Sequence, residues 1–184
     1  MDAVDLMKEE HENIKRGLQV IRKMCISVLE SGEVCYEDFE NIIEFIRNYA
    51  DKHHHNKEES ILFKKMEEQI GQMVKAPLSG MFIEHDLGRL FISNLESSLK
   101  RVKDGDKDSR IDVIANAIGY ADLLSRHIDK EDKVIYAFAR RSLSVDALED
   151  VNNECRLVEK SAEEKNIQNT YIKILKKLEA KWNE

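Results

Sequence analysis

Residues 50–63, ADKHHHNKEESILF, place three consecutive histidines just before two glutamates and an apolar segment. In an α-helix of about 3.6 residues per turn, side chains four residues apart project from the same face. Steps of three or four residues from His54 reach apolar side chains and Glu58, so His54 and Glu58 are predicted to face inward. The same steps from His55 reach acidic and amide side chains, which predicts that His55 and Glu59 face solvent.

Three other segments also place a histidine on the apolar stripe of a predicted helix: His11, His85, and His127, with Glu131 one turn after His127. A single histidine of this kind is most often a hydrogen-bonded core residue, and a single histidine–glutamate pair is often a surface contact. Four helices facing one axis would instead bring all six side chains together: His11, His54, Glu58, His85, His127 and Glu131. Burying two unpaired carboxylates in an apolar core is costly unless cations bind them. The occurrence of all six side chains on inward helix faces therefore predicts a metal site.

Apolar residues at helical spacing predict four long helices, over residues 4–28, 39–63, 78–99 and 111–138. Gly32 follows the first helix, and the polar segment 103–109 follows the third. The segment up to Pro77 is predicted to be a connection, because proline is best tolerated in the first turn of a helix. Four long helices with short loops favour an all-α fold, an up-down-up-down four-helix bundle.

The pattern changes after Ser142, where shorter amphipathic segments follow. Ser144 is a predicted N-cap for a helix that continues through Leu157. A polar break near Lys165 precedes another apolar face over residues 167–182. We expect a bundle of residues 1–142 and, in the same domain, C-terminal helices of residues 143–184 packed on it.

Composition limits the class of protein. The 184 residues suit one domain, and 42% hydrophobic residues argue against disorder. The formal net charge of −7 makes nucleic acid an unexpected partner. No segment has the pattern of a signal peptide or a membrane span. Three separated cysteines without a CxxC pair (Cys25, Cys35 and Cys155) suit a reducing, cytoplasmic location.

The donor types narrow the choice of metal. Imidazole and carboxylate without thiolate suit iron, manganese or zinc. Six side chains exceed the needs of one tetrahedral zinc ion, but they suit two ions bridged by both glutamates. The ExxH spacing of ferritin-like di-iron sites and the HExxH spacing of metalloproteases are both absent from the sequence.

These motifs resemble the hemerythrin family, in particular its bacterial and archaeal HHE cation-binding group. The matching segments are Glu10–His11, His54–Glu59 with Leu62–Phe63, Glu84–Arg89, and His127–Asp132. The resemblance implies a non-haem di-iron centre with oxo, hydroxo or carboxylate bridges. It assigns His11 and His54 to one iron, His85 and His127 to the other, and Glu58 and Glu131 to the bridges.

The chain departs from oxygen-carrying hemerythrins at two positions. Those proteins have a further histidine one turn before the third-helix ligand, where this chain has Met81, either a core residue or an alternative ligand. Losing one imidazole would leave an additional open or water-filled position on one iron. Their last carboxylate corresponds to Asp132, whereas helical phase favours Glu131 as the ligand and leaves Asp132 to support it. Tyr120 and Tyr49 are either bundle aromatics, hydrogen-bond donors to a metal-bound species, or replacements for the missing histidine.

The sequence thus favours a cytoplasmic di-iron binding protein, rather than an enzyme, that binds or senses oxygen, nitric oxide, peroxide or iron. Its expected partner is a small diatomic molecule or peroxide. One alternative is a di-iron enzyme that consumes peroxide or nitric oxide, or a stress protein that supplies iron to damaged iron–sulfur centres. Another is a metal-free interaction module whose appended helices dock a protein. Oligomeric state is left open.

Overall fold

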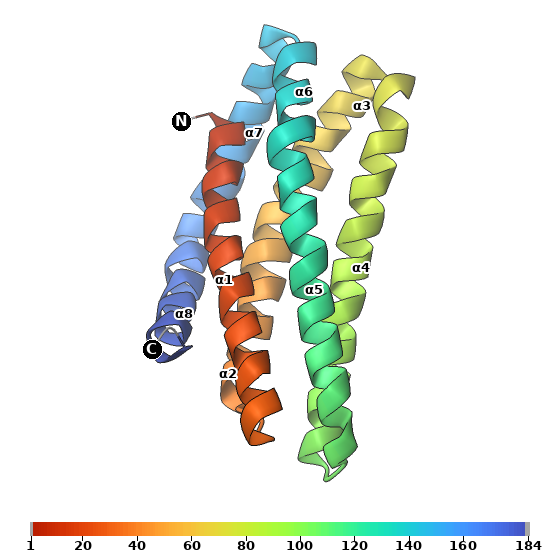
Figure 1. The fold of residues 1–184 in the computed structure, drawn as a ribbon. Coiled ribbons are helices and arrows are strands. Elements are labelled where there is room, and N and C mark those ends of the chain that lie inside the picture. Colours follow the sequence, from red (N-terminus) through yellow and green to blue (C-terminus); the bar gives the residue numbers. More distant parts are fainter. Residues whose placement is uncertain (1, 183–184) are drawn as a thin grey trace.

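The computed structural model describes residues 2–182 and confirms the predicted all-α bundle (Figure 1). Two of its four long rods are single helices, α1 (Ala3–Ser31) and α4 (Gln72–Lys103). The second rod contains α2 (Tyr36–Phe45), η1 (Ile46–His55), η2 (Glu58–Phe63) and α3 (Lys64–Ile70). The fourth rod contains α5 (Arg110–Lys130), η4 (Glu131–Ile135) and α6 (Tyr136–Ser142). Sequence-adjacent rods run antiparallel, as short connections require.

The predicted helix ends at Gly32 and in the polar loop are confirmed. Gly32 adopts φ 72°, and its N–H bonds to the carbonyl of Val28, so a residue without a Cβ ends α1 with little strain. The polar segment after α4 contains a short 3₁₀ turn, η3 (Lys107–Ser109), which leads directly into α5.

One predicted boundary is wrong, the start of the third rod. The expected connection up to Pro77 is helical, because α4 begins at Gln72 and includes Pro77. A proline inside a helix lacks the N–H that would bond to the carbonyl four residues earlier, which here belongs to Met73. Met73 is 74% exposed, so solvent reaches this first part of α4 and lowers the cost of the missing bond.

Three segments of the second and fourth rods, η1, η2 and η4, are π-helical. In a π-helix each N–H bonds to the carbonyl five residues earlier, so the wider turn changes the direction of the side chains that follow. The first contains the three consecutive histidines, and the other two begin at Glu58 and Glu131. The departures from α-helical geometry therefore coincide with the candidate metal ligands.

Buried apolar residues form two clusters along the bundle, and the buried histidines lie between them. Within α1, His11 lies between Met7 of one cluster and Ile14 of the other. In the other three rods the buried histidines also lie between the two clusters. Leu62, Met81 and Ile135 belong to the cluster of Met7. Ala50, Ile92 and Leu124 belong to the cluster of Ile14. An apolar layer above and below keeps water away, which strengthens electrostatic interactions between the layers.

The C-terminal residues form α7 (Val145–Glu164) and α8 (Ile167–Trp182), which lie along the outside of the bundle (Figure 1). The predicted N-cap is confirmed, because the Ser144 hydroxyl accepts a hydrogen bond of 3.2 Å from the Ala147 amide. Leu175 and Leu178 of α8 are buried in the core that α1 and α2 share. These helices therefore contribute to the hydrophobic core.

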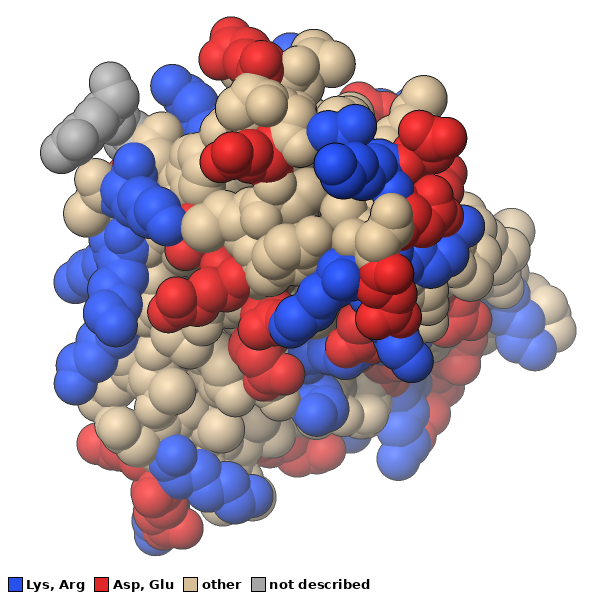
Figure 2. Space-filling view, turned by 90° about the horizontal axis from the view of Figure 1, so that it is seen from below, with Lys and Arg blue, Asp and Glu red and all other residues tan. Residues whose placement is uncertain are grey.

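Acidic and basic side chains are interspersed on the face of the molecule seen from below in Figure 2. Several acidic and basic side chains of the molecule are paired across helices, for example Arg101 of α4 with Asp112 of α5 at 2.6 Å. Among the residues described, none of the helices has the length and apolarity that crossing a membrane requires.

Candidate metal centre

Two groups of buried side chains meet at the middle of the bundle. The first contains His11, His54, Glu58 and Glu131, and the second contains His55, Glu58, His85 and His127. Within each group the potential ligand atoms lie within 4.8 Å of one another. Glu58 belongs to both groups, so the two sites adjoin. The structure thus brings together all six residues singled out from the sequence, with His11 and His54 in the first group and His85 and His127 in the second.

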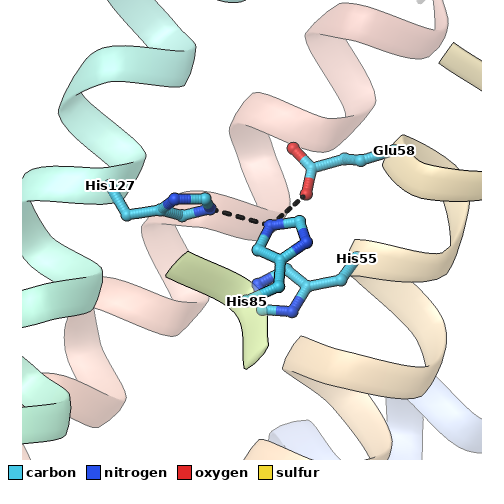
Figure 3. A group of neighbouring side chains, drawn as sticks. All are labelled: His55, Glu58, His85 and His127. Atoms are coloured by element: carbon cyan, nitrogen blue, oxygen red, sulfur yellow. Dashed lines mark hydrogen bonds and ion pairs between the residues drawn. The ribbon is translucent and has the colours of Figure 1, made fainter. Parts of the chain in front are cut away.

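The predicted exposure of His55 is wrong. Its side chain is buried, and its ring stacks on that of His85 with centroids 3.9 Å apart, which Figure 3 shows beside His127 and Glu58. The α-helical phase fails here because His55 ends the π-helical segment η1, where one turn holds an additional residue. His55 therefore adds a third imidazole to the group of His85 and His127, for which the sequence predicted only these two histidines.

His53 is buried as well, but it faces away from this centre. Its Nε2 atom lies 3.0 Å from Glu10 and 3.4 Å from Glu159. These three residues also have metal-compatible spacing, yet the Lys57 ammonium lies among them and pairs with both carboxylates. The cation of this second polar cluster is thus a lysine of the protein itself.

Each of the five clustered imidazoles presents its Nδ1 atom to a carboxylate outside the two groups. The pairs are His11–Asp132 at 2.8 Å, His54–Glu10 at 2.8 Å, His55–Asp51 at 3.4 Å, His85–Glu59 at 2.6 Å and His127–Glu84 at 2.9 Å. A carboxylate at one ring nitrogen fixes the ring and its tautomer, and it raises the basicity of the nitrogen that faces a metal. Asp132 lies outside both groups, against His11.

The Nε2 atoms of four of these histidines, His11, His54, His85 and His127, face the centre. His127 Nε2 lies 3.1 Å from one oxygen of Glu131, and His11 Nε2 lies 3.3 Å from the other. His85 Nε2 lies 2.9 Å from His127 Nε2 and 3.5 Å from Glu58 (Figure 3). Glu131 therefore lies between the two groups of histidines.

Several of these converging atoms have no hydrogen-bond partner. They are His54 Nε2, Glu58 Oε2 and both carboxylate oxygens of Glu131. Leaving such atoms buried and unpaired costs roughly 1–3 kcal/mol each, and more where the group is charged. A metal cation would bind all of them, so the residues present fit a metal, and their nitrogen and oxygen donors fit iron, manganese or zinc.

The electrostatics of the centre also favour a cation. Burial and the nearby Glu131 carboxylate hold the pKa of Glu58 well above its usual range. Burial would raise the pKa of Glu131 too, but the imidazoles of His127 and His11 outweigh it and hold that pKa well below its usual range. Burial and the neighbouring His11 lower the pKa of His54 to about 4, so this ring is neutral, as a metal ligand must be.

Tyr136 is a residue of the centre that the sequence analysis missed. Its hydroxyl donates a hydrogen bond to Glu58, and its ring stacks on His11 with centroids 5.5 Å apart. Tyr136 follows Glu131 by five residues, which is one turn of the π-helical segment η4, and α-helical spacing does not select this position.

The other candidates lie outside both groups. The Tyr49 hydroxyl accepts a hydrogen bond from Asn13 at 2.9 Å, and Met81 is buried in an apolar cluster with Phe63. Tyr120 is buried and lines a pocket together with His55 and His85 of the second group. Its hydroxyl has no hydrogen-bond partner. The additional potential donor beside His85 is therefore His55, and it is neither Tyr49 nor Tyr120.

The fold and this centre together define the class of protein: helical bundles with a buried site of histidines and carboxylates for cations. The family model described as hemerythrin HHE cation binding domain matches residues 2–139. The chain therefore belongs to the hemerythrin HHE cation-binding family. No curated protein and no solved structure gave a significant match.

His53 and His55, two residues apart in the sequence, give a direct test of which histidine belongs to the centre. We expect His55→Ala to lose at least half of the bound metal, because it removes a donor from the group of His85 and His127. We expect His53→Ala to keep its metal, because His53 faces Glu10 and Glu159. Metal analysis of the purified variants compares them. Equal metal content in the two variants would contradict the placement of His55.

Proposed function

We propose that the chain is a non-haem di-iron protein of the hemerythrin type that binds a small molecule such as oxygen, nitric oxide or peroxide. The observation that carries the proposal is the pair of adjoining buried groups that share Glu58. We assign one iron to His11 and His54, the other to His55, His85 and His127, and a bridging role to Glu58 and Glu131.

In this proposal iron supplies Lewis acidity and one-electron redox chemistry, and the protein supplies the environment. Carboxylates 2.6–2.9 Å from Nδ1 hold the rings of His11, His54, His85 and His127 in place, and Asp51 lies 3.4 Å from Nδ1 of His55. The Tyr136 hydroxyl restrains Glu58. The apolar clusters above and below exclude water, which favours a small, weakly hydrated ligand.

The number of donors supports binding of an external ligand. Each group contains four side chains that offer one ligand atom each, whereas an iron ion in a protein commonly accepts further ligands at open positions. A small molecule can therefore bind without displacing a histidine. The free state of Cys25, Cys35 and Cys155 supports function in a reducing compartment, which we propose to be the cytoplasm.

The proposal is tested by loading the protein with Fe(II) under anaerobic conditions, measuring bound iron, and titrating oxygen while recording absorbance. We expect two irons per chain and a new absorption band on oxidation. A band that reverses under vacuum indicates oxygen carriage, and an irreversible change indicates sensing. Consumption of peroxide or nitric oxide far beyond the iron equivalents would favour the enzyme alternative. Failure to bind Fe(II) would contradict the proposal and favour a metal-free interaction module.

A further inference from the structure

A cavity of about 170 Å³ lies beside the metal centre, between η1, α4 and α5. The stacked rings of His55 and His85 form part of its wall, and Figure 3 shows them on one side of the centre. The remaining wall is largely apolar, with Ile46, Ile92 and Leu124. The volume far exceeds the roughly 10–15 Å³ that one water needs, and it is below the ~300–1,000 Å³ of pockets for drug-sized ligands. It therefore suits a small organic molecule.

Among the residues of this wall, the Tyr120 hydroxyl is a hydrogen-bond donor without a partner, and His55 Nδ1 also makes no hydrogen bond but lies 3.4 Å from the Asp51 carboxylate. Tyr120 lines the cavity from α5, is 2% exposed, and its hydroxyl makes no hydrogen bond. Burial raises the pKa of Tyr120 well above its usual range, so the phenol keeps its proton and remains a donor. A buried hydroxyl without a partner is costly, and an acceptor atom of an occupant would remove that cost.

The charged side chains around the cavity are already paired. Arg47 forms two hydrogen bonds with Glu96, at 2.8 and 2.9 Å. Arg89 lies 2.8 Å from Asp51 and 2.7 Å from Glu59. The cavity therefore offers an occupant apolar contacts and one hydroxyl rather than an uncompensated charge, which favours an uncharged molecule.

A glycine keeps the space open. Gly88 lies in the middle of α4 and lines the cavity, although glycine there costs the helix about 1 kcal/mol relative to alanine. A Cβ atom at position 88 would lie 3.5 Å from the Tyr120 ring, so a larger side chain would occupy the space beside the phenol.

We propose that this cavity binds a small uncharged organic molecule with an apolar body and one oxygen acceptor, which takes a hydrogen bond from Tyr120. The occupant lies next to His55 and His85. The inference rests on the proposed function only where it places the occupant beside a metal ion, since the cavity, the phenol and Gly88 belong to the fold.

The test uses cyclopentanone as a probe and the purified full-length protein, with iron content measured on the same sample. Binding is followed by calorimetry and by the infrared carbonyl stretch of the probe. We expect saturable binding and a shift of the stretch to lower frequency. Tyr120→Phe is expected to weaken binding roughly threefold to tenfold, the value of one net hydrogen bond, and to abolish the shift. Cyclopentene, which lacks the oxygen, should bind both proteins equally.

Gly88→Leu fills the cavity and is expected to abolish binding of the probe. Gly80→Leu is the matched control on the same helix, because a Cβ at position 80 meets no atom within 4 Å and Gly80 does not line the cavity. Unchanged binding in Gly88→Leu, or absence of saturable binding to the wild-type protein, would overturn the proposal. If Gly88→Leu loses its helical circular dichroism spectrum, the test is the comparison of Tyr120→Phe with the wild-type protein. Equal affinity of the two proteins for cyclopentanone, with an equal shift of its carbonyl stretch, would overturn the proposal. Binding by a sample that takes up no iron would contradict the proposed function alone.

Discussion

The Glu58→Ala variant is expected to retain less than half of the metal bound by the wild-type protein. Glu58 is the residue common to both groups of potential ligands, so its loss affects both sites. Its side chain is fully buried, and its Oε2 atom has no hydrogen-bond partner. Truncation therefore removes a potential donor from each group, and the adjacent carboxylate, Glu59, is engaged with His85 Nδ1 at 2.6 Å and with Arg89 at 2.7 Å. Metal analysis after Fe(II) loading measures the effect.

Glu67→Ala is the matched control for this experiment, because Glu67 is an exposed residue of the same rod, in α3. We expect it to bind as much metal as the wild-type protein. Retention of both metal ions by Glu58→Ala, with an intact helical spectrum, would show that Glu58 is not shared between two metal ions.

The Lys57→Met variant is expected to lose about 3–5 kcal/mol of unfolding free energy, the typical effect of breaking a buried ion pair from one side. The Lys57 ammonium is fully buried and pairs with Glu10 and Glu159. Burial alone would raise the pKa of Glu10, but hydrogen bonds from His53 and His54, with the nearby Lys57 charge, hold it well below its usual range. The substitution leaves a buried carboxylate with less compensation.

Urea unfolding of the metal-free protein measures this loss, so that metal binding does not mask it. Lys64→Met is the control, because Lys64 is exposed at the start of α3 and should change stability by less than about 0.5 kcal/mol. A loss of less than about 1 kcal/mol in Lys57→Met would mean that Lys57 does not carry the stability of this cluster.

Helical periodicity was sufficient to predict the bundle and the meeting of six side chains. His11 and His85 lie in uninterrupted α-helices, where a spacing of three or four residues identifies the inward face. His127 lies in the last turn of α5, before the π-helical segment begins, so the same spacing holds there. Gly32 and Ser144 mark helix ends through local chemistry that a sequence displays directly.

The two errors at the centre, the predicted exposure of His55 and the omission of Tyr136, have a common physical cause in the π-helical segments. Wider turns in η1 and η4 direct His55 and Tyr136 toward the centre, and a prediction based on 3.6 residues per turn places them elsewhere. Such a turn is stabilised by tertiary packing around the buried polar groups rather than by the residues of the turn alone. The sequence also could not show the cavity beside Tyr120, because a cavity depends on how three rods pack.

The two adjacent acidic residues Glu131 and Asp132 have different surroundings. Glu131 and Asp132 are adjacent acidic residues, and only their directions distinguish them. Glu131 is fully buried between the histidines, whereas Asp132 contacts His11 from outside at its Nδ1 atom. Helical phase predicts the inward direction of Glu131 because this residue directly follows the regular helix α5.

The most direct test of the central claim is a crystal structure of the Fe(II)-loaded protein with anomalous diffraction recorded at the iron absorption edge. We expect two anomalous peaks in the middle of the bundle, one beside His11 and His54 and the other beside His55 and His85, with Glu58 between them. A single peak, or peaks at the surface away from these histidines, would contradict a paired metal centre.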